Sequence, residues 1–371
     1  MQFNPTTRRT FFKNAAKAIL LSVLFNPLRN LLAYGNNETI PSWTELVDHA
    51  RWCPTVHNLQ PHLIKIISET EAELYYNPPR LLPIGDPNSI FATLAMGIFQ
   101  EHLSIAASPY GKKVEITEVF SPVNIENKEP TLFAKLRLIS STEKEELNRE
   151  LIKKRRTSRL KYNGKPLNQE TLAKIKNETA KFEHTFFSTS NQEVVDLLVK
   201  LNQETLFEDI NSKANCEELD HLFRYTKKEA KTKKDGLWAK CMCFPGLLVK
   251  SVLQHPEKWH KGLREKLLTK YYKAAFKGTS TICWFEGKFD NTNDWLKAGR
   301  MFARTWLLIT KENAYIQPFG SLITNIKAYK QINEELAHPA EGNKLWMIFR
   351  TGYSKEPTRS FRLSTEEIII K

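Results

Sequence analysis

The residues best suited to binding chemistry lie in a basic segment, 153–166, with the sequence KKRRTSRLKYNGKP. Arg155, Thr157 and Arg159 stand at alternate positions, so an extended backbone would direct two guanidinium groups and a hydroxyl to one side. Guanidinium groups bind phosphate oxygens bidentately, and a hydroxyl adds a short donor bond. The segment therefore predicts a phosphate site, and the alternative interpretation is a basic run that simply faces water.

A second candidate is the loop 54–61, with the sequence PTVHNLQP. A proline at each end restricts the backbone and predicts a stiff, irregular loop. Asn58 and Gln60 carry amide donors and acceptors, which suit the carbonyls and nitrogens of a ring system. The loop is therefore a candidate for contact with a heterocyclic ligand.

Familiar catalytic and nucleotide-binding motifs are absent from the sequence. It contains no Gly-x-Gly, and hence no dinucleotide fingerprint, and it has no P-loop, no His-Glu-x-x-His and no Gly-x-Ser-x-Gly. The five cysteines are odd in number and show neither zinc-ligand nor Cys-x-x-Cys spacing, so we expect free thiols. The residues thus predict a binding site without a metal and without a catalytic acid, base or nucleophile.

Length and charge limit the classes of protein that fit. A chain of 371 residues with 41% hydrophobic residues supports a substantial core and favours two structural units. The formal net charge of +14 suits nucleic acid, an anionic membrane or an anionic cofactor. No nucleic-acid motif accompanies the charge, so we expect no nucleic-acid partner and interpret the charge as a surface property plus a phosphate site.

The N-terminus has the pattern of an export signal. The residues TRRTFFK at 7–13 precede an apolar run, Ala15 to Phe25, which only Lys17 interrupts. A charged start followed by a short apolar run is typical of a signal, and adjacent arginines before Phe-Phe-Lys resemble a twin-arginine signal. We expect residues 1–38 to lie outside the fold and the chain to be periplasmic, either released or tethered by an uncleaved N-terminus. An amphipathic helix or a lone membrane anchor is the alternative.

The rest of the chain alternates strands and helices. β-branched and aromatic residues predict strands at 63–68, 73–76, 114–120, 132–139, 279–285 and 344–353. Helical spacing predicts a helix from 43 that stops at Cys53-Pro54, helices at 88–108, 168–177 and 293–308, and a mainly helical region at 190–275. Gly97 and Gly299 each lie inside a long apolar helix, and fourteen residues beyond each stands a residue tolerant of left-handed backbone, Gly111 or Asn313. This spacing suggests a weak internal duplication. Gly97 in mid-helix costs about 1 kcal/mol relative to alanine, so we expect it to permit a close approach to another part of the chain.

Together, these motifs resemble the FMN-dependent nitroreductase family. The family pattern Arg-x-Ser/Thr-x-Arg corresponds to the motif that begins at Arg155, and its Pro-Ser-x-x-Asn-x-Gln-Pro loop corresponds to residues 54–61. The residues RLLP at 80–83, DP at 86–87 and the helix with Gly97 and Glu101 follow in the family's order. The resemblance covers about 42–370 and is weakest at 185–275.

The resemblance implies an α+β protein with a nitroreductase-like fold. Ordinary members are dimers with the flavin at the interface, where one subunit supplies the arginines and the other the loop. Here a single chain carries both, so we expect two fused half-repeats that form an intrachain pseudo-dimer, each with a mainly antiparallel sheet flanked by helices. The halves would be 39–140 and 141–371, with a helical lid insertion at about 190–275. This arrangement is similar to the Acg-like branch and predicts a monomer.

The resemblance also assigns a cofactor, FMN, and residues that would contact it. The phosphate would be held by Arg155, Thr157, Arg159 and Arg362. Arg362 matches the second arginine of a family segment, whereas Phe361 replaces the first and Arg359 is the nearest substitute. The ribityl chain and ring would be contacted by Pro54, Thr55, Val56, Asn58 and Gln60, and backbone at Phe319 and Gly320 would lie near flavin N5.

Three functions remain open from the sequence. The first is an oxidoreductase that passes hydride from NAD(P)H through FMN to a nitro-aromatic or quinone-type small molecule. The second is a flavin-binding or flavin-sequestering protein without turnover, in which residues 190–275 cover the flavin. The third is a basic, membrane-proximal scaffold without a cofactor.

Overall fold

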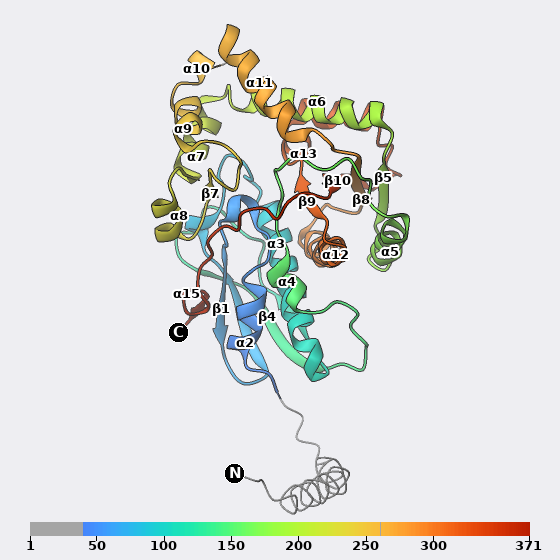
Figure 1. Ribbon diagram of the computed structural model, residues 1–371. Helices are drawn as coiled ribbons and strands as arrows, with labels where there is room; N and C mark the ends of the chain where they lie inside the picture. The colour runs from blue at the N-terminus through green and yellow to red at the C-terminus, as the bar shows by residue number, and fades with distance from the viewer. Residues whose placement is uncertain (1–39, 260) are drawn as a thin grey trace, which may run out of the picture. The chain divides into compact units, whose positions relative to one another are not determined.

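The computed structural model describes residues 40–259 and 261–371, and Pro41–Lys371 form one compact unit (Figure 1). The predicted export signal over residues 1–38 lies outside the described residues and stays a prediction. The predicted boundary between two halves at 140/141 also stays a prediction, because the strands and helices on its two sides pack within this single unit.

The first sheet has five strands in the order β11-β1-β2-β4-β3. Its members are β1 (His62–Ile66), β2 (Glu71–Tyr76), β3 (Lys112–Val119), β4 (Thr131–Ser140) and β11 (Ile369–Ile370). All pairs are antiparallel except β1 with β11. Ala72, Leu74 and Tyr76 alternate into the core, as a half-buried strand requires. The four strands predicted in this sheet, β1 to β4, are confirmed. The fifth strand, β11, was not predicted, and it adds the C-terminal residues Ile369–Ile370 to the sheet.

The second sheet has four strands in the order β5-β8-β10-β9, all antiparallel. They are β5 (Thr185–Thr189), β8 (Thr281–Gly287), β9 (Tyr315–Pro318) and β10 (Lys344–Gly352). The central strands β8 and β10 are buried on both faces and were predicted from their β-branched and aromatic residues. The edge strands β5 and β9 were not predicted, because each is short.

Two long helices cross between the sheets, α3 (Ile90–Ala107) and α12 (Thr292–Lys311) (Figure 1). A Cβ atom on Gly97 would lie 2.3 Å from the carbonyl oxygen of Leu296, so the predicted close approach at this glycine is confirmed. Residues Ile90–Tyr110 are long and apolar enough to cross a membrane, but 83% of the apolar 18-residue window within them is buried in the fold. It is therefore a core helix of this unit.

The remaining helices surround these layers. They are α2 (Trp43–Ala50), α4 (Glu150–Lys154), α5 (Gln169–Ala180), α6 (Gln192–Asp209), α7 (Lys213–Leu222), α8 (Lys227–Lys233), α9 (Gly246–Gln254), α10 (Pro256–Trp259), α11 (Gly262–Phe276), α13 (Ser321–Thr324), α14 (Ile326–Glu335) and α15 (Thr365–Ile368). The short parallel pair β6 (Phe223–Arg224) and β7 (Leu237–Trp238) interrupts the helices of residues 190–275. The region is mainly helical, as predicted, and the α+β class with mainly antiparallel sheets flanked by helices is confirmed.

Candidate anion and cofactor site

The loop between α2 and β1 has an unusual backbone. His57, Asn58 and Gln60 have φ values of 47°, 60° and 54°. Non-glycine residues rarely adopt this left-handed region, at a cost of about 1–3 kcal/mol each when the conformation is poorly populated. Such a loop persists only where its surroundings hold it, and strained backbone of this kind concentrates at binding sites.

Gln60 ties three distant segments together. Its side chain is fully buried and donates through Nε2 to the carbonyls of Asn58 and Lys234, both at 2.9 Å. Its Oε1 accepts a hydrogen bond from the backbone N–H of Leu363 at 2.9 Å. The side-chain amide of Gln60 thus uses its donors and its acceptor within the protein, and its role in this structure is to stabilise the loop.

Asn58 joins the loop to the C-terminal segment. Its Nδ2 donates to the carbonyl of Phe361 at 3.0 Å and to Ser360 Oγ at 3.3 Å. Its Oδ1 is buried and accepts no hydrogen bond from any described residue. A buried acceptor without a donor calls for an explanation, and a ligand that supplies an N–H or O–H would satisfy it.

Four arginines from two segments about two hundred positions apart gather beside this loop; we call Arg155, Arg156, Arg359 and Arg362 the arginine cluster. Arg155 is 7% exposed, donates to the carbonyl of Trp52 at 2.9 Å and lies 4.6 Å from the centre of the Trp306 ring. Arg362 donates to the carbonyl of Cys53 at 2.7 Å. The guanidinium of Arg359 lies 3.4 Å from the centre of the Trp52 ring.

The cluster concentrates positive charge with little compensation. Burial, and then the charge of Arg362, lowers the pKa of Arg155 to about 9. Burial, and then the charge of Arg156, lowers the pKa of Arg359 to about 10. Among the described residues, one carboxylate pairs with the cluster, Glu356 at 2.8 Å from Arg156. Buried like charges of this kind favour an anion between them.

Several N–H groups of the cluster are also unsatisfied. The Nε atoms of Arg155, Arg156 and Arg359, and Nη2 of Arg359, are buried and have no acceptor within residues 40–259 and 261–371. Guanidinium donors prefer carboxylate or phosphate oxygens in this situation. The donor set therefore fits the phosphate of a cofactor.

Arg159 lies in a different neighbourhood from the cluster. Its charge, after the larger effect of burial, lowers the pKa of His57 to about 4. Burial lowers the pKa of Arg159 itself, and the nearby Cys241 and Cys243 offset this lowering only in part. The structure thus places Arg159 beside the loop and Arg155 in the cluster, so the two predicted phosphate ligands have different surroundings.

Thr157 lies between them on extended backbone. It forms an isolated parallel bridge with Ile316, and the N–H of Ser158 donates to the carbonyl of Ile316 at 3.1 Å. Ser158 is fully buried, and its Oγ lies 2.8 Å from Ser354 Oγ. The predicted extended conformation of this segment is present.

The remaining predicted contacts, at Phe319 and Gly320, differ from each other. Phe319 is 1% exposed, its ring lies 5.7 Å from that of Phe276, and its N–H donates to the carbonyl of Ile348 at 2.9 Å. Gly320 is the N-cap of α13, and nothing lies within 4 Å of where its Cβ would be. Phe319 is therefore a core residue whose N–H is used within the sheet, whereas the surroundings of Gly320 are open.

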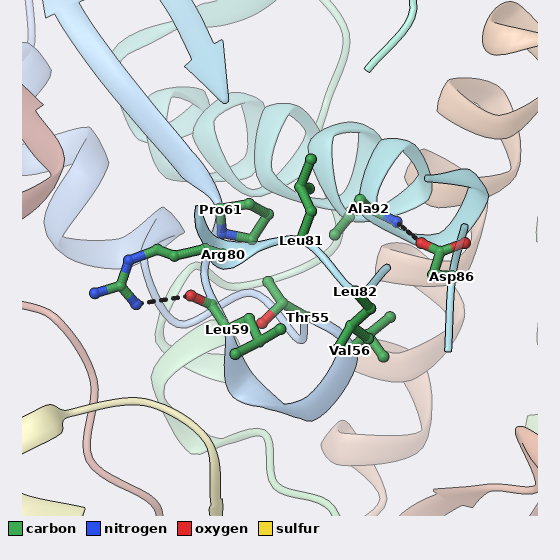
Figure 2. Close-up of a pocket in the computed structure, with 10 residues that line it drawn as sticks. Thr55, Val56, Leu59, Pro61, Arg80, Leu81, Leu82, Asp86 and Ala92 are labelled. Carbon is green, nitrogen blue, oxygen red and sulfur yellow. Dashed lines mark hydrogen bonds between the residues drawn. The ribbon is translucent and has the colours of Figure 1, made fainter. Parts of the chain in front are cut away.

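Figure 2 shows the small pocket beside Thr55 and Val56. It encloses about 10 Å³, which is room for about one water molecule. Arg80 Nη1 donates to the carbonyl of Leu59 at 2.9 Å on one side, and Asp86 accepts from the N–H of Ala92 at 2.9 Å on the other (Figure 2). Sites for cofactors usually measure about 300–1,000 Å³, so this pocket does not admit a flavin ring.

The mainly helical segment 213–243 packs against this loop, and we call this segment the cover. Leu222 packs against Val56, Leu59 and Leu82. Glu218 accepts hydrogen bonds from the backbone N–H groups of Ile84 at 2.8 Å and Gly85 at 2.9 Å.

Further contacts extend the cover toward the C-terminal segment. Asp235 bridges Arg224 at 2.6 Å and Arg80 at 3.3 Å. The rings of Trp238 and Phe361 lie 5.3 Å apart. The cover thus contacts both the region of the loop 54–61, through Arg80, and the C-terminal segment, through Phe361.

The sequence identified part of this arrangement. Pro54, Thr55, Val56 and Asn58 lie on the loop as expected, and Arg155 and Arg362 lie together. Arg156 and Trp52 were not predicted as site residues: Arg156 was visible within the basic run, whereas nothing in the sequence singles out Trp52. Arg359 was predicted as a substitute ligand, and its position in the cluster agrees with that idea.

Comparison with known proteins gives structural likenesses only, since no protein-family model and no curated protein matches the chain. A putative nitroreductase from Anabaena variabilis is 10% identical, with a TM-score of 0.46, and the match covers 84% of this chain and 87% of that one. The FMN-dependent nitroreductase NfnB from Mycobacterium smegmatis, solved with NADPH, is 17% identical with a TM-score of 0.31, covering 56% and 86%. A nitroreductase with bound FMN from Bacteroides fragilis is 11% identical with a TM-score of 0.30, covering 57% and 89%.

Proposed function

We propose that this chain is an FMN-binding flavoprotein of the nitroreductase type. The observation that carries the proposal is the arginine cluster, in which buried guanidinium N–H groups from two distant segments have no acceptor in the described chain. The motifs that resemble the nitroreductase family support the same proposal, since Arg155 donates to the carbonyl of Trp52 and Arg362 to that of Cys53, directly before the loop 54–61.

In this proposal the arginine cluster and Asn58 bind the cofactor. Arg155 and Arg359 hold the phosphate, and Arg156 and Arg362 add charge. Asn58 Oδ1 accepts a hydrogen bond from the cofactor. When bound, FMN supplies reversible hydride transfer, and the protein contributes position and electrostatics. NAD(P)H would be the donor, and a nitro-aromatic or quinone-type molecule the acceptor.

Binding of the ring requires a change in the cover. The pocket beside Thr55 holds about 10 Å³, and Leu222 packs against the apolar side of the loop. The contacts at Ile84 and Gly85 are polar and exposed, so water can replace them at modest cost. We therefore propose that residues 213–243 shift outward to admit the ring.

The test is the identity of the molecule that co-purifies with the full chain. We expect a flavin absorption band, and a released mass equal to that of FMN. Reconstitution of the chain with FMN and with riboflavin should give tighter binding of FMN, because only FMN carries the phosphate. A colourless protein that binds neither compound would contradict the proposal.

A second candidate function is flavin binding without turnover. The cover favours it, because Glu218, Leu222 and Asp235 all fasten this segment to the loop region. Anaerobic mixing of the flavin-loaded chain with NADH and with NADPH separates the two functions. Bleaching of the flavin by either donor supports the oxidoreductase, and an unchanged spectrum with both supports sequestration.

Three further proposals concern the whole chain. We propose export by the twin-arginine route to the periplasm, from the residues at 7–25. We also propose that the two sheets and their central helices, α3 and α12, are fused half-repeats. A fused pair already contains both halves of one site, so we expect a monomer by light scattering.

A further inference from the structure

Helix α11 presents an apolar stripe to the outside of the fold. Leu263, Leu267 and Tyr271 follow one another at four-residue spacing and are 84%, 59% and 38% exposed. Residues spaced by four lie on one side of a helix, so the three side chains form one row. Single exposed leucines are common on protein surfaces, but an aligned row on a helix indicates a contact surface.

The opposite side of α11 is anchored in the protein. Leu268, Tyr272 and Phe276 are at most 7% exposed, and the rings of Tyr272 and Phe276 stack at 4.4 Å. The exposed row is therefore not the only apolar face of the helix. The helix is already held by one face. Within the outward row, Tyr271 donates to the carbonyl of Cys243 and its ring lies 4.8 Å from that of Phe244, so the two leucines are the exposed apolar part of the row.

Basic side chains surround this row. Between 246 and 277 the chain has eight lysines and arginines against two glutamates, a balance of +6, and all ten side chains are exposed. The basic residues are Lys250, Lys258, Lys261, Arg264, Lys266, Lys270, Lys273 and Lys277. Within the described residues, no carboxylate forms an ion pair with Lys266, Lys270 or Lys273, so their charges face outward unneutralised.

An aromatic side chain lies next to the start of the helix. Trp259 is partly exposed, donates through Nε1 to Ser251 Oγ at 2.9 Å, and has the guanidinium of Arg264 5.5 Å from its ring centre. Trp in such a position, with a polar tip and an apolar body, suits the boundary between water and lipid.

We infer that the outer face of α11 docks onto an anionic lipid surface. A row of leucines flanked by lysines is the pattern of an interfacial helix, whose apolar side chains enter the acyl boundary while the lysines meet lipid phosphates. A second copy of this chain would bring two faces of the same charge together, so self-association is disfavoured. Nucleic acid would use the lysines but not the exposed leucines. An acidic protein is the remaining alternative, and it is separated in the test.

The experiment measures amide hydrogen exchange of the full chain by mass spectrometry, with the peptide Gly262–Phe276 as the readout. This local readout is needed because another part of the chain can bind vesicles without involving α11. Vesicles of phosphatidylcholine with phosphatidylglycerol should slow exchange in this peptide, and vesicles of phosphatidylcholine alone should not.

Two pairs of variants test the two parts of the face. The double variant Lys266→Ala with Lys270→Ala should require an about thirtyfold higher lipid concentration for the same protection. The reason is the loss of two charges that lie near the anionic surface. Leu263→Ser with Leu267→Ser should weaken it by more than about tenfold, since the leucines no longer enter the lipid. All four positions are exposed, so the fold should be retained.

Matched controls lie elsewhere on the chain. Ile326→Ser removes an apolar side chain that is 87% exposed on α14, and Lys227→Ala with Lys228→Ala removes two exposed charges on α8. Neither should change the protection of 262–276. The inference is overturned if anionic vesicles leave the peptide unprotected, or if neutral vesicles protect it equally. A third result also overturns the inference. If soluble polyglutamate protects the peptide as well as vesicles do, and the leucine double variant is protected like the parent, the partner of this face is an acidic protein and not a lipid surface.

Discussion

Gly97 and Gly299 meet where α3 and α12 cross: a Cβ atom on Gly299 would lie 3.1 Å from Gly97 Cα and 2.1 Å from the carbonyl oxygen of Leu94. The two helices thus touch through their backbones. Any larger residue at either position must push the helices apart, and the two sheets that pack on them would lose contact.

Gly299→Ala should therefore lower the free energy of unfolding by about 1–3 kcal/mol or more, although alanine favours helix by about 1 kcal/mol. Urea denaturation measures the change. Gly320→Ala is the matched control, since nothing lies within 4 Å of its Cβ position. Equal stability of the two variants would show that the helices do not touch at Gly299.

Arg359→Ala should raise the dissociation constant for FMN about tenfold or more, because a charge-assisted hydrogen bond contributes about 1.5–3 kcal/mol. Titration of flavin fluorescence measures it. Riboflavin provides an internal control, because it lacks the phosphate and its affinity should stay the same. Arg137→Ala, at a residue paired with Glu71 on the surface, should change neither affinity. An equal loss for both flavins would place Arg359 at the ring and not at the phosphate.

The cover should loosen when its charged contacts are removed. Glu218→Gln with Asp235→Asn weakens charged hydrogen bonds of about 1.5–3 kcal/mol each, so the open form should be at least about tenfold more populated. We expect faster loading of FMN by the apo chain and faster hydrogen exchange in residues 213–233. Glu217→Gln, on the same helix but in an exposed pair with Lys213, is the control. Unchanged loading kinetics in the double variant would mean that FMN enters without movement of the cover.

His184 should contribute to acid sensitivity. Burial lowers its pKa to about 4, and its Nδ1 accepts the indole N–H of Trp346 at 3.2 Å, so the folded state holds the neutral ring. The unfolded chain takes up the proton near pH 6.5, and stability falls as the pH drops from 6.5 toward 4, by up to about 1.4 kcal/mol per pH unit.

His184→Gln keeps an acceptor for Trp346 and removes the titration. The variant should therefore lose less stability than the parent between pH 6.5 and 4, as measured by urea denaturation at each pH. His338→Gln serves as the control on a loop near the C-terminal end of α14. Parallel pH profiles for the parent and His184→Gln would refute a buried neutral His184.

Local patterns in the sequence determined most of the regular structure. β-branched and aromatic residues identified β8 and β10, and the spacing of apolar residues identified α3 and α12, because burial requires these patterns within one short stretch. The mid-helix Gly97 also indicated a close approach before its partner was known. Short edge strands such as β5 and β9 lack a comparable signal, since their pairing depends on distant neighbours.

The sequence also indicated that Arg155 and the loop 54–61 are candidates for binding. It did not determine that Arg359 and Arg362 return beside Trp52 and Cys53, since that depends on the pairing of the C-terminal strand β11 with β1 at the edge of the first sheet. Nor did it determine that the side-chain amide of Gln60 would form hydrogen bonds with the backbone of Lys234 and Leu363. Only the tertiary structure decides which donors are consumed within the protein and which stay unpaired, because each hydrogen bond joins residues far apart in the chain.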